Sequence, residues 1–408
     1  MPALAPRSRW VMISLVFAAT VINYLDRQTL SVVAPILMEQ YHMTNVTYSQ
    51  IIFAFMVAYT IMNGVSGPLI DRLGTRRGYA WTTAWWSAAA MLHALAVGPW
   101  SLGTFRFLLG MGEAGNWPAG VKVVAEWFPV RERALASGIF NSGSAVGAIL
   151  APPLVAFIVL QLGWRAAFAA VGAIGFVWVI AWLLIYTTPE AAKKEAEAPP
   201  IPLPKLFLTR FVLSFTLAKV FLDPVWYFYI FWFPAYLKQA RHFDLADIGK
   251  YAWIPFMVAG VGNVLGGWLA AELLKRNISL SAARKTSVAV FVCLMASAIP
   301  AVLVSDVRLS IAWVSVAMLG YTGVTANMLA IPADVFPKNA VASIWGLASL
   351  GAGFGGMLFA LITGWLVDHY SYVPVFIGFG LIPFVALFIL LTWLGPIRPM
   401  TPEPRATA

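Results

Sequence analysis

The sequence contains little charge and very few cysteines or histidines. Only 11% of its 408 residues are charged, whereas a soluble globular domain carries about 25%. The single cysteine, Cys293, excludes an intrachain disulfide and any cysteine-based zinc or redox motif, and its apolar surroundings predict a small core residue. Four scattered histidines do not favour a metal site. The chain shows no phosphate-binding glycine loop, which disfavours an ATP-driven protein.

The abundant residues are apolar and aromatic. Hydrophobic residues make up 61% of the chain, and its 18 tryptophans and 13 tyrosines suit the aromatic belts at the two surfaces of a bilayer. A helix needs about 20 apolar residues to cross the hydrocarbon core. The sequence therefore predicts an all-α polytopic membrane protein with twelve spans, at residues 10–34, 48–70, 78–97, 101–121, 134–158, 165–187, 211–237, 250–272, 285–304, 308–330, 341–363 and 372–394.

The basic residues are distributed as in a membrane protein. The formal net charge is +10, but most lysines and arginines fall in the loops that alternate spans place on one side, and this is the positive-inside pattern. It argues against nucleic acid as a partner. Because twelve is an even number, it predicts that both termini lie in the cytoplasm.

The chain divides into two halves that repeat. Residues 188–210 are first charged and then proline-rich, which predicts a cytoplasmic linker between an N-terminal six-helix bundle (1–187) and a C-terminal one (211–408). A parallel repeat of this kind is expected for the two bundles of a secondary transporter. Small residues would let neighbouring helices approach closely. At an offset of 208 positions the matching glycines are Gly112 with Gly320, Gly115 with Gly323, Gly138 with Gly346, Gly143 with Gly351 and Gly147 with Gly355.

The segment GPLIDRLGTRR, residues 67–77, joins the second and third predicted spans. It resembles the signature loop of the major facilitator superfamily. An acid in this loop can accept hydrogen bonds from a helix N-terminus or an arginine across the bundle interface, so it can latch one conformation. The arginines either take part in this latch or only anchor the loop. The expected gating residues are Gly67, Asp71, Arg72, Gly74 and Arg76.

The second half holds a degraded copy of this loop. Ala271 stands where Asp71 stands in the first half, and Glu272 follows one residue later. A second latch is therefore either absent or shifted to Glu272.

Four charged residues lie inside apolar spans, where each charge costs about 2.5–3.5 kcal/mol at the bilayer centre. They are Asp26 and Arg27 in the first span and Arg106 and Glu113 in the fourth. Arg106 and Glu113 share one helix face, about 10 Å apart along the axis, so they cannot pair directly. We expect Asp26 to pair with Arg106 in one conformation, which leaves Arg27 to face a polar cavity. The alternative is a structural ion pair between the two spans.

The stretches ATVINYLDRQTLSVVAP, TFRFLLGMGEAGNWPAG and DPVWYFYIFWFPAYL resemble the anion:cation symporter family of that superfamily, and most of all its hexuronate branch. The resemblance assigns Arg27 to the substrate carboxylate, and Asp26 and Glu113 to proton coupling. A guanidinium binds a carboxylate with two hydrogen bonds, and a carboxyl group in a dry site can load and unload a proton.

The same resemblance implies neutral hydrogen-bonding partners for a hydroxylated substrate. Tyr24 and Tyr59 match positions that line the family's substrate site, and the size of Ser144 favours a bulkier, cyclic sugar acid. Packing or a place at the membrane surface is the competing interpretation for each tyrosine. The full set of expected substrate-binding residues is Arg27, Tyr24, Tyr59, Arg106, Asn141, Ser144, Tyr227, Tyr229 and Asn327.

Lys219 and Asp223 lie four residues apart in the seventh span and are predicted to pair with each other. The pair is either structural or a second gating element.

The leading hypothesis is a proton-coupled importer of a sugar acid, most of all a hexuronate such as galacturonate or glucuronate, that works by rocker-switch alternating access. It implies a multi-pass protein of the bacterial inner membrane, a monomer, without cofactor or metal. The alternatives are an organic-anion exchanger, an exporter, a sodium- or phosphate-linked transporter, or a symporter for galactonate, glucarate or another organic anion. A receptor and a membrane enzyme are disfavoured, because the tails are short and no nucleophile–base pair is present.

Overall fold

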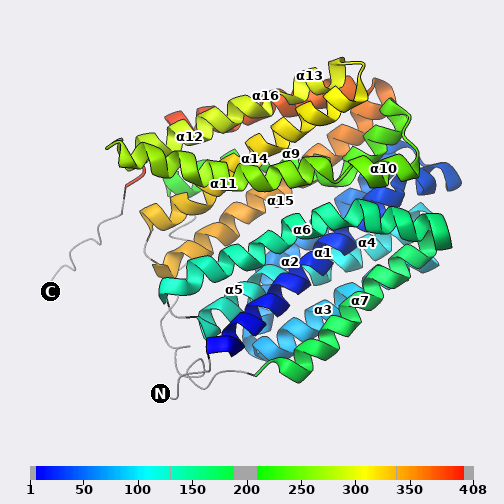
Figure 1. Cartoon of the computed structure of the whole chain (residues 1–408), viewed down its shortest axis with the longest axis horizontal. Coiled ribbons are helices and arrows are strands. Elements are labelled where there is room, and N and C mark those ends of the chain that lie inside the picture. Colours follow the sequence, from blue (N-terminus) through cyan, green and yellow to red (C-terminus); the bar gives the residue numbers. More distant parts are fainter. Residues whose placement is uncertain (1–5, 129, 188–208, 337, 399–408) are drawn as a thin grey trace.

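The computed structural model describes residues 6–128, 130–187, 209–336 and 338–398, and these ranges are almost entirely helical (Figure 1). The expected linker at 188–210 falls largely outside them. The first half contains α1 (Pro6–Gln40), α2 (Asn45–Leu73), α3 (Thr75–Leu92), the 3-10 turn η1 (His93–Leu95), α4 (Pro99–Glu113), α5 (Asn116–Trp127), α6 (Val130–Leu162) and α7 (Trp164–Ile185). The second half contains α9 (Arg210–Arg241), α10 (Leu245–Tyr251), α11 (Ile254–Lys275), α12 (Leu280–Met295), α13 (Ala298–Leu303), α14 (Val307–Val335), α15 (Lys338–His369) and α16 (Tyr372–Thr392).

The helices have the length and surface of membrane spans. In the part of the chain that the structure describes, 10 helical segments are long and apolar enough to cross a bilayer. The other two expected spans, 78–97 and 101–121, are helical but fall in the short α3 and in the interrupted α4 and α5. Large apolar side chains point outward, with Phe157 64% and Phe388 66% exposed. Apolar side chains on the outside suit contact with lipid. Helices suit it as well, because their backbone groups are hydrogen-bonded within the helix. The protein is a multi-pass membrane protein.

Cys293 does not lie in the core as predicted. It is exposed on α12. Hydrophobicity separates inside from outside in water, but in a membrane both the core and the lipid-facing surface are apolar, so the composition around a residue does not show which way it points.

The repeat seen in the sequence is also a repeat in packing. A Cβ added to Gly143 of α6 would lie 2.7 Å from the carbonyl oxygen of Phe17 in α1, and one added to Gly351 of α15 would lie 2.4 Å from that of Thr216 in α9. Only glycine allows these backbones to come so close. The next pair behaves alike, since Gly147 meets Val21 and Gly355 meets Val220.

The glycines of α4 and α14 also have matching roles. Gly112 lies against Trp86 of α3, and Gly320 lies against Met295 of α12. Gly138, in contrast, has nothing within 4 Å of an added Cβ, and the same holds for Gly346. These two glycines do not mediate the close approach that the sequence suggested, although they keep the symmetry of the two halves.

Hydrogen bonds join the two halves at one end of the bundle. The start of α1 and the end of α16 lie at the opposite end, which we call the terminal end, and the α1–α2 connection lies at the far end (Figure 1). At the far end, both carboxylate oxygens of Asp368 in α15 accept hydrogen bonds from the start of α2. The backbone N–H of Asn45 lies 2.9 Å away and that of Val46 2.7 Å away. One helix turn further in, Tyr48 donates to the carbonyl of Phe231 at 2.7 Å.

Small residues complete the far-end contact. An added Cβ on Gly364 would collide with Ser49, and one on Gly249 of α10 would collide with Ala156 of α6. Towards the terminal end, by contrast, Gly67 of α2 has open space around it. Among the described residues, close contacts between the halves run from the far end to the middle of the bundle, where Gly353 lies against Thr60 and Gly356 against Met56, and they do not include Gly67.

Candidate functional site

The central feature is a buried ion pair between α1 and α4. The Arg27 Nη2 lies 2.7 Å from Glu113 Oε2, and Arg27 Nε donates to the same oxygen at 2.9 Å. The two side chains are only 2% and 0% exposed. A buried pair of this kind has a large desolvation penalty, and losing one partner strands the other charge.

Asp26 does not have the partner that the sequence suggested. Both carboxylate oxygens of Asp26 are buried without a hydrogen-bond partner, so no Asp26–Arg106 pair forms in this conformation. Arg106 instead donates from Nη2 to the backbone carbonyl of Arg27. Asp26 and Arg27 are consecutive and point in different directions from one helix, and in this conformation Arg27 is the one that pairs with an oppositely charged side chain of α4, Glu113.

The cluster contains several unsatisfied atoms. Arg106 Nε and Nη1, Glu113 Oε1 and both Asp26 oxygens are buried and have no partner. Arg106 and Glu113 also interact electrostatically with Asp26. Buried polar atoms are nearly always satisfied in stable proteins, so this group has the unused hydrogen-bonding capacity that water, a proton or a ligand requires.

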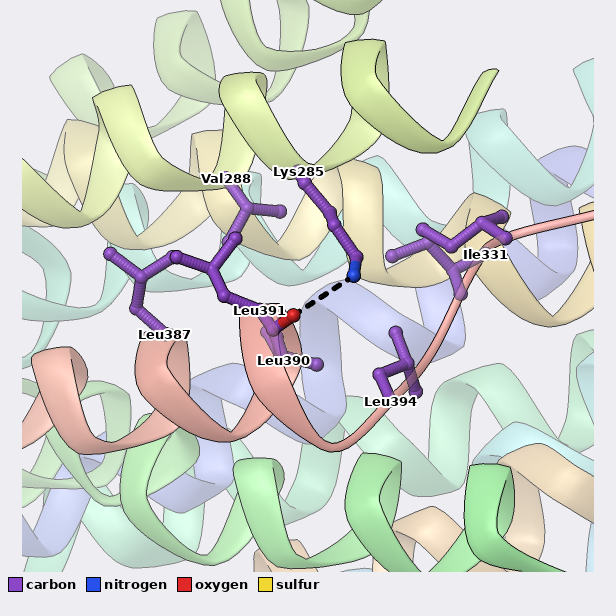
Figure 2. A pocket seen from close by; sticks show the side chains of 8 residues that line it. Lys285, Val288, Ile331, Leu387, Leu390, Leu391 and Leu394 are labelled. Atoms are coloured by element: carbon purple, nitrogen blue, oxygen red, sulfur yellow. Dashed lines mark hydrogen bonds between the residues drawn. The ribbon is translucent and has the colours of Figure 1, made fainter. Parts of the chain in front are cut away.

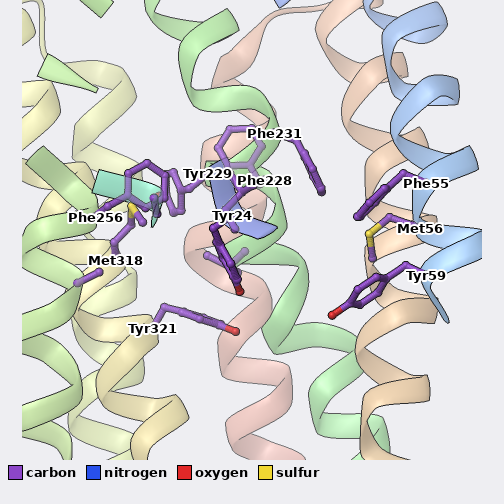
Figure 3. Close-up of a cluster of buried hydrophobic side chains, with 14 of the residues drawn as sticks. Tyr24, Phe55, Met56, Tyr59, Phe228, Tyr229, Phe231, Phe256, Met318 and Tyr321 are labelled. Carbon is purple, nitrogen blue, oxygen red and sulfur yellow. The ribbon is translucent and has the colours of Figure 1, made fainter. Parts of the chain in front are cut away.

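Aromatic rings surround the Arg27 guanidinium. Its carbon lies 5.0 Å from the ring centre of Tyr24, 5.3 Å from that of Phe55 and 4.8 Å from that of Tyr59. Figure 3 shows the hydroxyl groups of Tyr24, Tyr59 and Tyr321 directed into the region between the two halves. Rings at this distance stabilise a cation without neutralising it.

The second half contributes its own polar group. The predicted pair is present: Lys219 Nζ lies 2.6 Å from Asp223 Oδ2. Tyr321 of α14 donates to the other oxygen of Asp223 at 3.2 Å. Tyr227, one turn along α9, interacts electrostatically with both Asp223 and Arg27. Tyr227 is therefore near charged groups of both halves.

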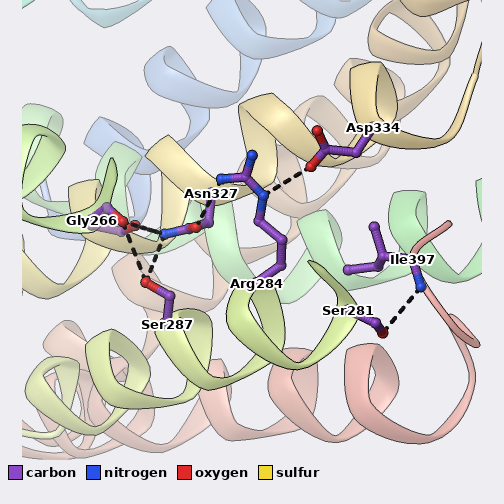
Figure 4. A network of polar contacts seen from close by, with 8 residues as sticks. Gly266, Ser281, Arg284, Ser287, Asn327, Asp334 and Ile397 are labelled. Atoms are coloured by element: carbon purple, nitrogen blue, oxygen red, sulfur yellow. Dashed lines mark hydrogen bonds and ion pairs between the residues drawn. The ribbon is translucent and has the colours of Figure 1, made fainter. Parts of the chain in front are cut away.

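Two expected site residues lie away from this region. Tyr229 is fully buried among aromatic rings of its own half, including Phe233 and Phe376. Asn327 ties three helices together, since it donates to the carbonyl of Gly266 at 2.9 Å and to Ser287 at 3.1 Å (Figure 4). A polar residue in a membrane span requires hydrogen-bond partners. The sequence alone does not show whether these partners belong to a neighbouring helix or to a ligand.

Asn141 and Ser144 lie on α6, which packs closely against α1. Ser144 donates to the backbone carbonyl of Asn141 at 2.7 Å, and both residues are partly buried. Their contacts link them neither to Arg27 nor to Asp26 in this conformation.

The loop between α2 and α3 is only partly described, and the side chain of Asp71 lies outside the described residues. Gly74 has φ +77°, a conformation that favours glycine, and it ends α2 and begins α3. Arg76 is exposed and donates to the carbonyl of Leu183 in α7, within its own half, and Arg72 is exposed. These contacts fit an anchoring role for Arg76.

The degraded second copy makes no cross-half contact through Glu272. Its carboxylate lies 3.2 Å from Arg276 and 3.9 Å from Lys275, at the end of the same helix. The alternative of a latch shifted to Glu272 is not formed in this conformation.

The small pockets of the structure do not coincide with the buried charges. One, between α12, α14 and α16, is lined mainly by aliphatic side chains, and Lys285 donates to the Leu391 carbonyl across it (Figure 2). Another is lined by Ile52 of α2 and by mostly aromatic residues of α9, α15 and α16, including Tyr227. No group of three or more His, Cys, Asp or Glu side chains that could hold a metal occurs among the described residues.

The sequence did not indicate Phe55, Tyr321 or Trp226, whose ring stacks on that of Tyr321. Tyr321 could have been found, because it occupies the position of Glu113 at the 208-residue offset. Phe55 could not have been found from the sequence, because it is one apolar residue among many in an apolar span. Only the structure places its ring beside Arg27.

Comparisons with known proteins agree with this architecture. The family model of the Major Facilitator Superfamily matches residues 16–320 and 279–408. The chain is 32% identical over 407 residues to the hexuronate transporter of Escherichia coli strain K12, covering 95% of this chain and 94% of that protein. It is 36% identical over 306 residues to the galacturonate transporter of Dickeya chrysanthemi, covering 70% and 89%. A bacterial homologue of the human lysosomal transporter Spinster, solved in an inward-facing and unoccupied conformation, shares the fold with a TM-score of 0.71 at 17% identity, covering 95% and 96%. The chain belongs to the major facilitator superfamily of membrane transporters.

Proposed function

We propose that this protein is a proton-coupled symporter that imports a sugar acid, most of all a hexuronate. The observation that carries the proposal is the buried Arg27, which is held by Glu113 and by aromatic rings between the two halves. The named activities of the hexuronate and galacturonate transporters, to which the chain is similar over most of its length, support the same substrate class. A sugar acid needs one cationic anchor for its carboxylate and neutral partners for its hydroxyl groups.

The proton and the substrate would be linked through Arg27. Its contacts with Glu113 use Nε and Nη2, so a substrate carboxylate must compete with Glu113 for these donors. When Glu113 separates from Arg27, the carboxylate of Glu113 is left without a partner in a dry site. Binding a proton then removes the charge of Glu113. Asp26, already without a hydrogen-bond donor, is the second proton carrier. Arg106 lies within electrostatic range of both acids and can stabilise whichever is ionised.

The conformational cycle would be a rocking of the two bundles, 1–187 and 211–408, joined by the linker 188–210. Contacts at the far end, including Asp368 with the start of α2, close one side of the site. Opening that side requires these contacts to break while new contacts form near Gly67 and the α2–α3 loop, with Asp71 as the latch. We place both termini in the cytoplasm of a bacterial cell and the chain in the inner membrane as a monomer.

Uptake into proteoliposomes tests the proposal. Labelled galacturonate is supplied with and without an inward proton gradient, and glucuronate, galactonate and glucarate are added as competitors. We expect gradient-stimulated uptake that glucuronate blocks more strongly than the open-chain acids. Rapid counterflow that needs no pH difference would support an exchanger instead. Stronger competition by an open-chain acid would keep the family and change the substrate.

A further inference from the structure

The Lys219–Asp223 pair is unexpected as a structural element. Its charges lie one turn apart on a single helix, with side chains 7% and 8% exposed. An ion pair within one helix does not hold two helices together, and burying it is costly compared with apolar residues of similar size. The attraction between the two charges alone does not offset this cost.

The first half shows that the fold does not need the pair. The close contacts of Gly143 with Phe17 and of Gly351 with Thr216 align α1 with α9 at an offset of 199. On that alignment, the positions of Lys219 and Asp223 are occupied in α1 by Thr20 and Tyr24. The hydroxyl group of Thr20 donates a hydrogen bond to the backbone carbonyl of Val16. Neutral residues therefore suffice at this place in the bundle.

The pair also faces the site. Asp223 and Tyr227 are one turn apart on α9 and so share a face, and Tyr227 interacts electrostatically with Arg27. Tyr321 donates to Asp223 from α14, and Lys219 lies 4.8 Å from the ring centre of Trp345 in α15. Three helices of the second half thus hold one ammonium, one carboxylate and one phenol together next to Tyr227.

We propose that Lys219, Asp223 and Tyr321 form a second subsite that binds the hydroxyl groups of the substrate and excludes a second carboxylate. The inference rests on the proposed function. Sugar hydroxyls both donate and accept hydrogen bonds, so a carboxylate acceptor beside an ammonium donor suits them. Because Asp223 neutralises Lys219, the subsite offers no net positive charge to a second carboxylate. The protein then selects monocarboxylic sugar acids over dicarboxylic ones, and Asp223 sets that preference.

Binding to the purified full-length protein tests this with three ligands: galacturonate, the dicarboxylate galactarate, and cyclohexanecarboxylate, which lacks hydroxyl groups. Wild type is expected to bind them in that order. Asp223→Asn keeps the size and shape of the side chain but removes its negative charge, so the positive charge of Lys219 is no longer neutralised. We expect the ratio of galactarate to galacturonate affinity to rise at least tenfold. A ratio within twofold of wild type, with galacturonate still bound, would overturn the subsite and leave the proposed function intact.

A second variant covers the case in which Asp223→Asn does not fold. Tyr321→Phe removes only the hydroxyl group that donates to Asp223. Galacturonate affinity is expected to fall about three- to tenfold, with cyclohexanecarboxylate affinity unchanged. Equal losses for both ligands, or none, would contradict a hydroxyl-binding role. Glu272→Gln, which lies at the end of α11 and away from the site, is the matched control and should leave all three affinities unchanged. If wild type binds none of the three ligands, the proposed function fails and this inference fails with it.

Discussion

The two halves share a scaffold but place different chemistry at the same point. In the first half, Arg27 of α1 pairs with Glu113 of α4. At the matching positions of α9 and α14, Trp226 stacks on Tyr321, with ring centres 5.3 Å apart and planes inclined by 14°. The same contact between two helices is thus an ion pair on one side and an aromatic stack on the other.

The difference has a clear energetic meaning. An aromatic pair contributes about 0.5–1.5 kcal/mol beyond its buried area and does not depend on protonation. A buried ion pair does depend on it, because losing the charge of one partner leaves the other charge buried without compensation, at a cost of about 3–5 kcal/mol. The contact in the first half therefore depends on protonation, and the matching contact in the second half does not.

The largest effect is expected from removing the first-half cation. Arg27→Ala should weaken galacturonate binding at least 100-fold, equivalent to about 3 kcal/mol, since the carboxylate loses its anchor. Equilibrium binding to purified protein measures this. The double variant Arg27→Ala with Glu113→Gln removes the stranded acid and serves as the folding control. Preserved affinity in either variant would rule out Arg27 as the carboxylate anchor.

Neutralising the first-half acid should separate transport from protons. Glu113→Gln is expected to abolish gradient-driven accumulation while retaining at least part of the counterflow, because the amide can still occupy the site but cannot exchange a proton. Uptake in proteoliposomes at a set pH difference reports both. Tyr321→Phe, at the equivalent position, should keep its coupling. Gradient-driven uptake by Glu113→Gln would assign the proton to another group.

The far-end contact between the halves should respond more mildly. Asp368→Ala removes three hydrogen bonds to the start of α2, but the side chain is exposed, so water replaces part of them. The reporter is a single cysteine at the buried position of Ser49, in a protein whose native cysteine is removed by Cys293→Ser. We expect this cysteine to react with a maleimide several-fold faster when Asp368→Ala is present than when Asp368 is kept. Asp247→Ala is the control, because its ion pair with Lys250 stays within α10. Equal reaction rates would show that Asp368 does not hold this end closed.

The smallest effect belongs to the degraded loop of the second half. Glu272→Gln breaks only ion pairs to Lys275 and Arg276, which are 75% and 71% exposed. Such pairs contribute about 0–1 kcal/mol. Thermal unfolding in detergent and uptake rate should both stay close to wild type. A large loss of uptake would show that Glu272 acts as a latch in another conformation.

Much of the fold could be predicted from particular residues. The apolar spans predict helices because backbone groups have no other partners in lipid, and the spaced glycines of the two halves predict a packing repeat that the contacts of Gly143 and Gly351 confirm. The Lys219–Asp223 pair was also predictable, since four residues make one helix turn. These features depend on spacing within one segment.

The choice of partner for Arg27 could not be predicted in this way. Asp26 and Arg27 are neighbours that point in different directions, and a rotation of α1 decides which of them meets α4. The same limit explains Cys293 and Asn327, whose sides of the helix are set by neighbouring helices rather than by their own sequence.

The sequence by itself determined that the chain crosses a membrane as two repeated sets of helices, and that a few charges lie where charge is expensive. These follow from the free energy of transferring each residue into lipid, which is local. Only the tertiary structure decided that Glu113 pairs with Arg27, that Asp26 is left without a partner, and that Trp226 and Tyr321 stack where the other half holds an ion pair. Those outcomes depend on the distance between helices far apart in the chain, and packing sets that distance.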